Sequence, residues 1–149
     1  MILDKRNEFM DAVALNTGAA GTYLVGDVID TSLVNRDLGL GADLWVVLRV
    51  TTAVTSAGAA TVQFKVSSDA QAAIATDGSA TDHLTTAAIP KATLAAGHTI
   101  LAARLPAGTY ERYLGILQIT GTAALTAGAV DAFLVDDYAS WSAYPDATN

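Results

Sequence analysis

The two histidines are the side chains best suited to act as a general base, and neither has the sequence context of a catalytic residue. His83 lies in the polar stretch Asp82-His83-Leu84, and His98 opens an apolar run directly after Gly97. The sequence has no Gly-x-Ser-x-Gly turn to present a nucleophile and no pair of histidines at metal-ligand spacing. We interpret both histidines as solvated or locally hydrogen-bonded residues.

The carboxylates also lack the sequence context of a catalytic or metal-binding site. Asp136 and Asp137 end an apolar run, but neighbours on a strand point to opposite faces and form no shared-proton pair. Asp27 and Asp30 are spaced loosely enough to join a calcium site, although the Asp-x-Asp-x-Asp-Gly pattern is absent. We therefore expect no catalytic residue, no metal and no cofactor, with calcium as a weak alternative. A hydrolase built on Asp136, Asp137 and His98 would require these side chains to converge.

Composition excludes further classes of protein. The 149 residues are 52% hydrophobic and 15% charged, with a net charge of −7 and no cysteine, which removes disulfides and thiolate zinc sites. The basic residues are few and scattered, so we expect no nucleic-acid partner. No run approaches the roughly 20 apolar residues that span a bilayer, so we expect no membrane association either.

Met1-Ile2-Leu3 is followed at once by charged residues, so no signal peptide is predicted. Gly39-Leu40-Gly41 lacks the rest of a phosphate-binding fingerprint and is interpreted as a turn.

The elements that would carry these residues are strands. Short apolar or alternating runs are separated by turn residues, which favours an all-β, jelly-roll-like β-sandwich of about eight strands within a single domain, 1–149. In Thr61–Ser67, strict alternation predicts that Val62, Phe64 and Val66 face the core. We expect this strand to form a hairpin with Leu44–Thr55, in which Trp45 is a core residue. The other predicted strands cover residues 23–29, 87–90, 98–105, 113–120 and 129–136.

The two ends of the chain do not follow the strand pattern. Residues 1–16 are predicted to form an arm or a short helix, and residues 140–149 an irregular tail. Both carry large apolar groups without core periodicity, so we interpret them as partner-contacting segments, the alternative being that each packs on its own sandwich. The candidate partner-binding residues are Ile2, Leu3, Phe9, Met10, Trp141 and Tyr144.

A series of short segments carries a resemblance that extends over most of the chain. The segments are Met1-Ile2-Leu3-Asp4-Lys5 with Glu8-Phe9 and Asp11-Ala12, Arg36-Asp37-Leu38-Gly39 with Gly41 and Leu44, Ala88-Ile89-Pro90-x-Ala92-x-Leu94-x-x-Gly97, Leu105-Pro106-x-Gly108 with Arg112-Tyr113-Leu114, and Thr126-Ala127-Gly128-x-Val130-x-Ala132-Phe133-Leu134-Val135. In this order and spacing they resemble the capsid cement (decoration) proteins of tailed phages, of the type found on the Bordetella short-tailed phage. Gly115 departs from the family pattern, in which a bulkier, often basic residue follows Arg-Tyr-Leu.

The resemblance implies a jelly-roll protein without enzyme activity. It implies a homo-oligomer, a dimer or a trimer, that binds the outer surface of a phage head assembled in the host cytoplasm. There it would stabilise the shell by bridging subunits of the major capsid protein. The alternative from a different class is a jelly-roll carbohydrate-binding module that uses Tyr110, Tyr113 or Trp141 as stacking platforms.

Overall fold

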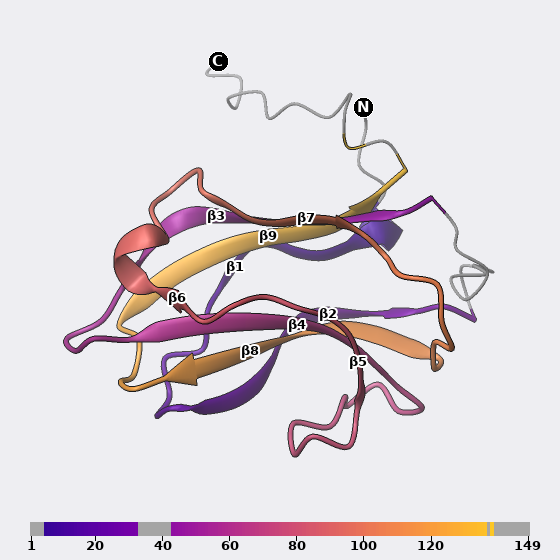
Figure 1. The fold of residues 1–149 in the computed structure, drawn as a ribbon, viewed down its shortest axis with the longest axis horizontal. Helices are drawn as coiled ribbons and strands as arrows, with labels where there is room; N and C mark the ends of the chain where they lie inside the picture. Colours follow the sequence, from indigo (N-terminus) through magenta and orange to yellow (C-terminus); the bar gives the residue numbers. More distant parts are fainter. Residues whose placement is uncertain (1–4, 33–42, 137, 139–149) are drawn as a thin grey trace.

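The computed structural model describes residues 5–32, 43–136 and 138. In this part of the chain nearly all regular structure is β, with two short 3-10 helices, η1 and η3 (Figure 1). The elements are η1 (Lys5–Asn7), β1 (Glu8–Ala14), β2 (Gly21–Asp30), β3 (Trp45–Thr55), β4 (Thr61–Asp69), β5 (Thr81–Thr85), β6 (Ile89–Pro90), η3 (Lys91–Thr93), β7 (Thr99–Arg104), β8 (Tyr113–Gly121) and β9 (Ala127–Val135).

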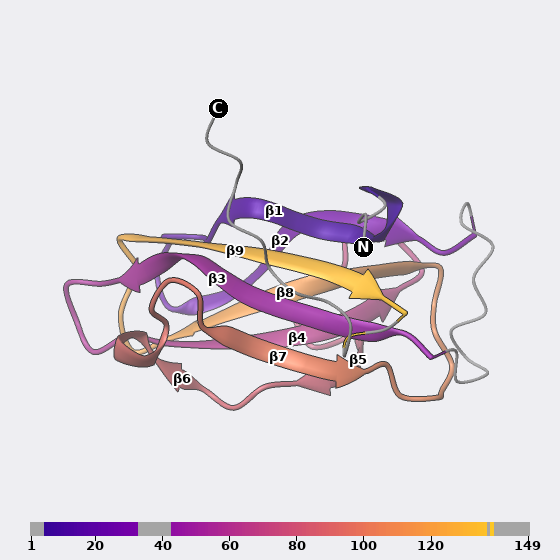
Figure 2. The same ribbon diagram turned by 90° about the horizontal axis from the view of Figure 1, so that it is seen from above.

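The strands form two antiparallel sheets that pack face to face (Figures 1 and 2). Sheet A has the order β1-β9-β3-β7, and sheet B has the order β2-β8-β4-β5, with the short β6 paired to β4. The pairs are nested along the chain, because β1 pairs with β9, β2 with β8, β3 with β7 and β4 with β5. This nesting is the strand order of a jelly roll, so the predicted fold class is confirmed.

The core lies between the two sheets and is built from alternate residues of the central strands. Val62, Phe64 and Val66 of β4 are 0%, 2% and 1% exposed, as their alternation predicts. From sheet A, β3 and β9 contribute Val46, Leu48, Val50, Val130, Ala132 and Leu134 to the same cluster.

The predicted hairpin between residues 44–55 and 61–67 is wrong. β3 pairs with β7 and β9 in sheet A, whereas β4 pairs with β8, β5 and β6 in sheet B. The chain between them therefore crosses from one layer to the other. Alternation shows that a segment is a strand with one apolar face, but it carries no information about which partner strand that segment has.

The predicted arm is also wrong for residues 8–14, which form the edge strand β1 beside β9. The pairing register shifts between Glu8 and Met10 and again between Met10 and Val13, and Ala12 has a φ of 47°. These bulges break the two-residue period, so the consecutive Phe9 and Met10 both enter the core. A bulged strand gives the ragged apolar spacing that we interpreted as an arm.

The connection between β4 and β5 covers part of the outer face of sheet B. Ile74 in this connection is 3% exposed and lies over Gly115 of β8. A Cβ atom at Gly115 would lie 2.6 Å from Ile74 Cδ1. The departure from the family pattern at Gly115 thus has a local physical reason, because a larger side chain would displace Ile74.

Candidate functional site

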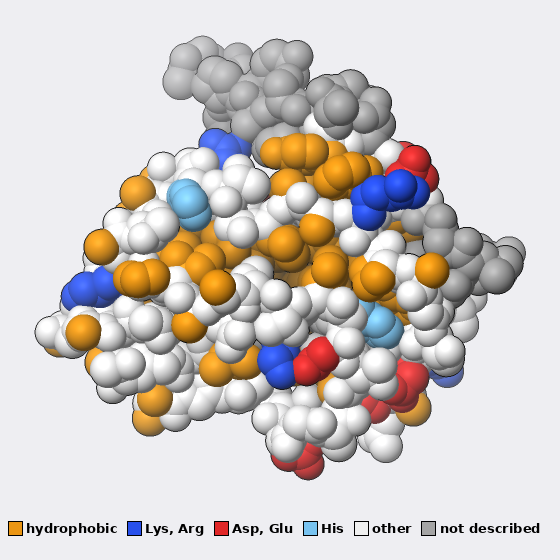
Figure 3. Space-filling view, viewed as in Figure 1, with side chains coloured by type: hydrophobic (Ala, Val, Ile, Leu, Met, Phe, Trp, Pro, Cys, Tyr) orange, Lys and Arg blue, Asp and Glu red, His pale blue; other side chains and the backbone are white. Residues whose placement is uncertain are grey.

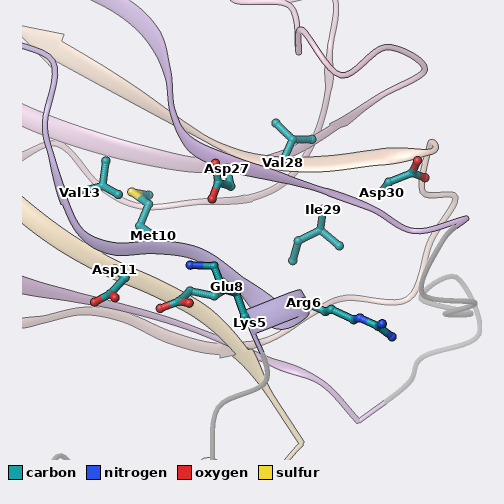
Figure 4. Close-up of a pocket in the computed structure, with 10 residues that line it drawn as sticks. All are labelled: Lys5, Arg6, Glu8, Met10, Asp11, Val13, Asp27, Val28, Ile29 and Asp30. Atoms are coloured by element: carbon teal, nitrogen blue, oxygen red, sulfur yellow. The ribbon is translucent and has the colours of Figure 1, made fainter.

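A cleft lies between β1 and β2, the edge strands of the two sheets (Figure 4). Its volume is about 840 Å³. It is lined by Lys5, Arg6, Glu8, Met10, Asp11, Val13, Asp27, Val28, Ile29 and Asp30.

The two edge strands approach each other closely at Gly26 of β2. At Gly26 the backbone has a φ of +75°, and a Cβ atom there would overlap the Phe9 carbonyl oxygen and the Met10 side chain. The β2–β8 register shifts between Val25 and Ile29, an interval that includes Gly26. The side chains of Met10 and Ile29, 1% and 5% exposed, give the cleft an apolar base.

Carboxylates occupy both walls of the cleft. Figure 4 shows Glu8 and Asp11 on β1 and Asp27 on the facing strand β2. Burial raises the pKa of Glu8, and the nearby charge of Asp11 raises it further, while Lys5 opposes the shift. Among the described residues, no salt bridge involves Glu8, Asp11 or Asp27. The cleft also contains the cationic side chains of Lys5 and Arg6, so its lining carries charges of both signs.

Asp30 differs from these carboxylates because it is held by Arg112. The guanidinium donates to both carboxylate oxygens, at 2.8 Å from Nη2 to Oδ2 and 3.1 Å from Nε to Oδ1. This hydrogen bonding, together with a hydrogen bond from Ser32, holds the pKa of Asp30 well below its usual range.

No group of three or more His, Cys, Asp or Glu side chains in the described residues could hold a metal ion, so Asp27 and Asp30 belong to no such site there.

A serine and a histidine meet elsewhere, between β4, β5 and the residues before β8. Ser68 Oγ lies 2.7 Å from His83 Nε2 and accepts a hydrogen bond from the Glu111 amide at 3.1 Å. The His83 ring stacks on Tyr110 with centroids 3.8 Å apart. Burial lowers the pKa of His83, against the opposing charges of Asp82 and Glu111. Because Ser68 is fully buried, its hydroxyl cannot attack a substrate, and the pair fixes the packing of β5.

The convergence required for the hydrolase alternative does not occur for His98 and Asp136. His98 O accepts a hydrogen bond from Val50 N, and Asp136 follows Val135, which lies opposite Trp45. The two residues therefore flank a stretch of β3 about 16 Å long. Asp137 lies outside the described residues.

An apolar cluster lies on the outer face of sheet A. Val47 and Phe133 lie opposite each other on β3 and β9, as do Trp45 and Val135, and these residues form a cluster separate from the main core. The Trp45 and Tyr138 rings stack with their centroids 5.6 Å apart. The prediction of Trp45 as a core residue is therefore wrong, because its half-buried ring lies on the outer face. Tyr138 was not predicted, although apolar residues on both faces of paired strands are a sequence signal for such a cluster.

The remaining predicted partner-binding residues fall into two groups. Phe9 and Met10 are each 1% exposed in the core, so neither side chain can contact a partner from the folded protein. Ile2, Leu3, Trp141 and Tyr144 lie outside the described residues.

The two tyrosines of the carbohydrate-binding alternative are both in contact with a neighbouring side chain. His83 stacks on Tyr110, whose hydroxyl donates to Pro106 O at 2.6 Å. The guanidinium carbon of Arg112 lies 4.9 Å from the centroid of the Tyr113 ring. One face of each ring is thus already covered. Trp141, the third proposed platform, lies outside the described residues.

Another apolar region lies on the side of the sandwich opposite the cleft between β1 and β2. Figure 3 shows hydrophobic side chains in a band between β7 and the edge formed by β5 and β6. The half-buried residues Leu84, Ile89, Ile100 and Leu101 pack there against the core. In the described residues, no helix is long and apolar enough to cross a membrane.

The nested strand pairs define a jelly-roll protein. Comparison with known proteins gives its family. The model of the family described as Bbp16 matches residues 9–134, so the chain belongs to the Bbp16 family, which is named after a Bordetella phage protein. No curated protein matches the chain.

Proposed function

We propose that this protein is a structural capsid decoration protein without enzyme activity, which binds the outer surface of a phage head and bridges subunits of the major capsid protein. The observation that carries the proposal is the family match over residues 9–134, which makes the chain a member of a phage-related family. The jelly-roll fold supports it, because a rigid sandwich can present several surfaces to neighbouring subunits at once.

The physical basis of the function is preferential binding to the assembled shell. A ligand that binds only the assembled state stabilises that state by mass action. A dimer or trimer that contacts several coat subunits gains avidity from weak individual contacts. The net charge of −7 supports the outer surface, since the inner surface faces nucleic acid phosphates.

In this proposal, residues near the two ends of the chain also contact the coat protein. Ile2, Leu3, Trp141 and Tyr144 are large apolar side chains close to the ends, where a chain most readily extends onto a neighbour. The protein needs neither a cofactor nor a metal, a membrane or a nucleic acid for this function.

The experiment is an add-back assay with heads. Purified heads that lack the protein are incubated with the full chain, and bound copies per head are counted by quantitative gel analysis. The temperature at which the heads release their contents is then measured with a DNA-binding dye. Saturable binding with a raised release temperature supports the proposal. If saturating protein neither binds nor changes the release temperature, the proposed function is wrong.

A further inference from the structure

The edge strand β5 is held on sheet B mainly by polar side chains (Figure 1). The residues of Thr81–Thr85 are all exposed or half-buried, and Leu84 is the one hydrophobic side chain among them. Asp82 accepts hydrogen bonds from Lys65 Nζ and Ser67 Oγ, each at 2.6 Å. A strand that buries so little apolar surface belongs to the part of a fold that opens at the lowest free energy.

A β-bulge places His83 at the centre of these contacts. The β4–β5 register shifts between Val66 and Ser67, and His83 is the extra residue on β5. A bulge redirects a side chain relative to the regular pleat. The His83 ring here lies with Nε2 2.7 Å from Ser68 Oγ and stacks on Tyr110, with 3.8 Å between the ring centroids. His83 therefore connects β5 both to β4 and to the segment before β8.

The hydrogen bonds of Ser68 determine which nitrogen of His83 carries the proton. Ser68 is 0% exposed, and its Oγ accepts from the Glu111 amide at 3.1 Å. Among the contacts that the structure describes for this hydroxyl, the one acceptor for its own hydrogen is His83 Nε2. A buried hydroxyl hydrogen needs an acceptor, so the neutral ring carries its proton on Nδ1. The next proton must then bind Nε2, the atom that faces Ser68.

The charged groups around the ring do not prevent this protonation. Burial lowers the pKa of His83 more than the charges of Asp82 and Glu111 raise it. Although burial raises the pKa of Asp82, its hydrogen bonds, above all the one from Lys65, bring it below the ordinary value. Burial raises the pKa of Tyr110, which stays neutral. The other charged residues of β4 and of the segment before β8 are bound elsewhere, Asp69 to the amides of Gln71 and Ala75, and Arg112 to Asp30. In mildly acidic solution the Lys65–Asp82 ion pair thus persists while His83 gains a proton.

We propose that His83 and Ser68 form an acid-sensitive latch, which holds β5 on sheet B when the ring is neutral and releases it when Nε2 is protonated. Protonation places two hydrogens between Nε2 and Ser68 Oγ, so the hydroxyl loses its acceptor. The charged ring also gains hydration when β5 moves into water. Both effects favour the opened strand.

The contacts on either side of β5 limit how far it opens. Thr86 N donates to Phe64 O at 2.9 Å, and Thr86 Oγ1 accepts from Phe64 N at 3.0 Å. Before β5, Asp69 holds the β4–β5 connection. Neither of these contacts involves His83, so the chain on both sides stays in place. Opening then exposes the edge of β4 at residues 65–68, which pair with β5, and an exposed edge can pair with another chain.

The first test is hydrogen exchange of the full chain, followed by mass spectrometry at pH 7.5 and 5.5. Protection factors are corrected for the intrinsic effect of pH on exchange. Peptides from β5 should be less protected than peptides from β3 and β9 at both pH values, because β5 opens locally. Their protection should fall at least about threefold between pH 7.5 and 5.5 in the wild type, and His83→Gln should abolish this fall. If β5 is as protected as β3 and β9, or if His83→Gln keeps the fall, the latch does not exist.

Ser67→Ala is the matched control. Ser67 is also 0% exposed and its hydroxyl also holds β5, but it does so through Asp82. This variant should lower the protection of β5 by the same factor at both pH values and so keep the wild-type dependence on pH. If it abolishes that dependence, the packing of β5 and not His83 is responsible, which contradicts the proposal.

The second test needs no altered protein for its result. Nitrogen-15 NMR of the histidine rings shows which ring nitrogen carries a proton, and the signals of His83 are identified by their absence in His83→Gln. We expect Nδ1 to be protonated and Nε2 to be unprotonated at pH 7.5. A proton on Nε2 at this pH would overturn the proposal, because Ser68 would then not donate to the ring. Both tests use the protein in solution, so their outcome does not depend on the proposed function.

Discussion

At the scale of single residues, backbone geometry and burial determine what each side chain does. Gly26 allows β1 and β2 to approach closely, because it has no side chain to overlap Phe9 and Met10. Gln118 is fully buried and holds the chain before β2, since its side chain accepts from Asn16 N at 2.8 Å and donates to Asn16 O at 2.9 Å. His83 serves as a hydrogen-bonded packing residue instead of a base.

Gly26→Ala should destabilise the protein strongly. Its φ of +75° is unfavourable for alanine, and the new methyl group would overlap the Phe9 carbonyl, which cannot move without shifting β1. We expect a loss of about 3 kcal/mol in the free energy of unfolding, measured by chemical denaturation. Gly78→Ala is the control, because Gly78 has a φ of +93° with no atom within 4 Å of the new methyl group, so only about 1–2 kcal/mol should be lost. Equal losses in the two variants would show that the close approach of β1 and β2 is unimportant.

Stability should fall in mildly acidic solution because of His83. Its pKa is lowered by burial, so the folded state binds fewer protons than the unfolded state once the pH falls below about 6.5. The contribution of neutral His83 to the free energy of unfolding is complete above that pH. It is lost as the pH falls toward the pKa that His83 has in the folded state. His83→Gln should flatten the dependence of unfolding free energy on pH between about 7.5 and 5.5. His98→Gln, which changes a histidine outside this cluster, is the matched control variant. A wild-type slope in His83→Gln would contradict the assignment.

At the scale of elements, edge strands and connections shape the surface more than the central strands do. β1 and β2 leave the cleft between them, and β7 with β5 and β6 borders the apolar band on the other side. The connection over sheet B is fixed by Asp69, which accepts from the amides of Gln71 and Ala75 at 3.1 Å and 3.0 Å. Ile74 then lies over Gly115, and this contact gives a prediction at this scale.

Gly115 and Ile74 should be energetically coupled. Gly115→Ala places a methyl group 2.6 Å from Ile74 Cδ1, and overpacking of this kind costs about 1–3 kcal/mol. In an Ile74→Ala background the nearest remaining side-chain atom is Leu24 Cδ1 at 3.3 Å, so the same change should cost less. A double-mutant cycle in denaturant should give a coupling energy above about 0.5 kcal/mol. Additive effects would mean that the β4–β5 connection moves freely away from β8.

At the scale of the whole molecule, the surfaces are different in character. Carboxylates line the β1–β2 cleft, hydrophobic side chains follow the β7 side, and the stacked rings lie on the outer face of sheet A. The first part of the chain belongs to the sandwich from Glu8 onward, which changes how the contribution of the N-terminal end to binding must be tested.

Deletion of residues 1–4 and deletion of residues 1–10 should have different effects. The shorter deletion stops before η1 and keeps β1, so the thermal unfolding temperature should remain close to wild type. The longer one removes Phe9 and Met10, both 1% exposed, and should cost several kcal/mol, about 3–5 for a buried Phe alone. Head occupancy measured after the shorter deletion therefore tests the proposed contact of Ile2 and Leu3 with the coat. Equal stability of the two truncated proteins would contradict the placement of β1 in the core.

The sequence by itself determined the local properties of this protein. Alternation along residues 61–67 predicted a strand whose Val62, Phe64 and Val66 face the core, and turn residues between the runs predicted an all-β sandwich. These properties depend on neighbours along the chain, so a single strand carries the information. The family resemblance extended the prediction to function, where the Bbp16 match supports a phage-related family.

Only the tertiary structure decided which strands pair and which faces are covered. β3 and β4 are consecutive but lie in different sheets, and the bulges of β1 turn Phe9 and Met10 together into the core. Trp45 and Tyr138 are far apart in the sequence and meet because β3 and β9 are neighbours in sheet A. Pairing between distant segments depends on the packing energy of the whole core, which no local pattern of residues records.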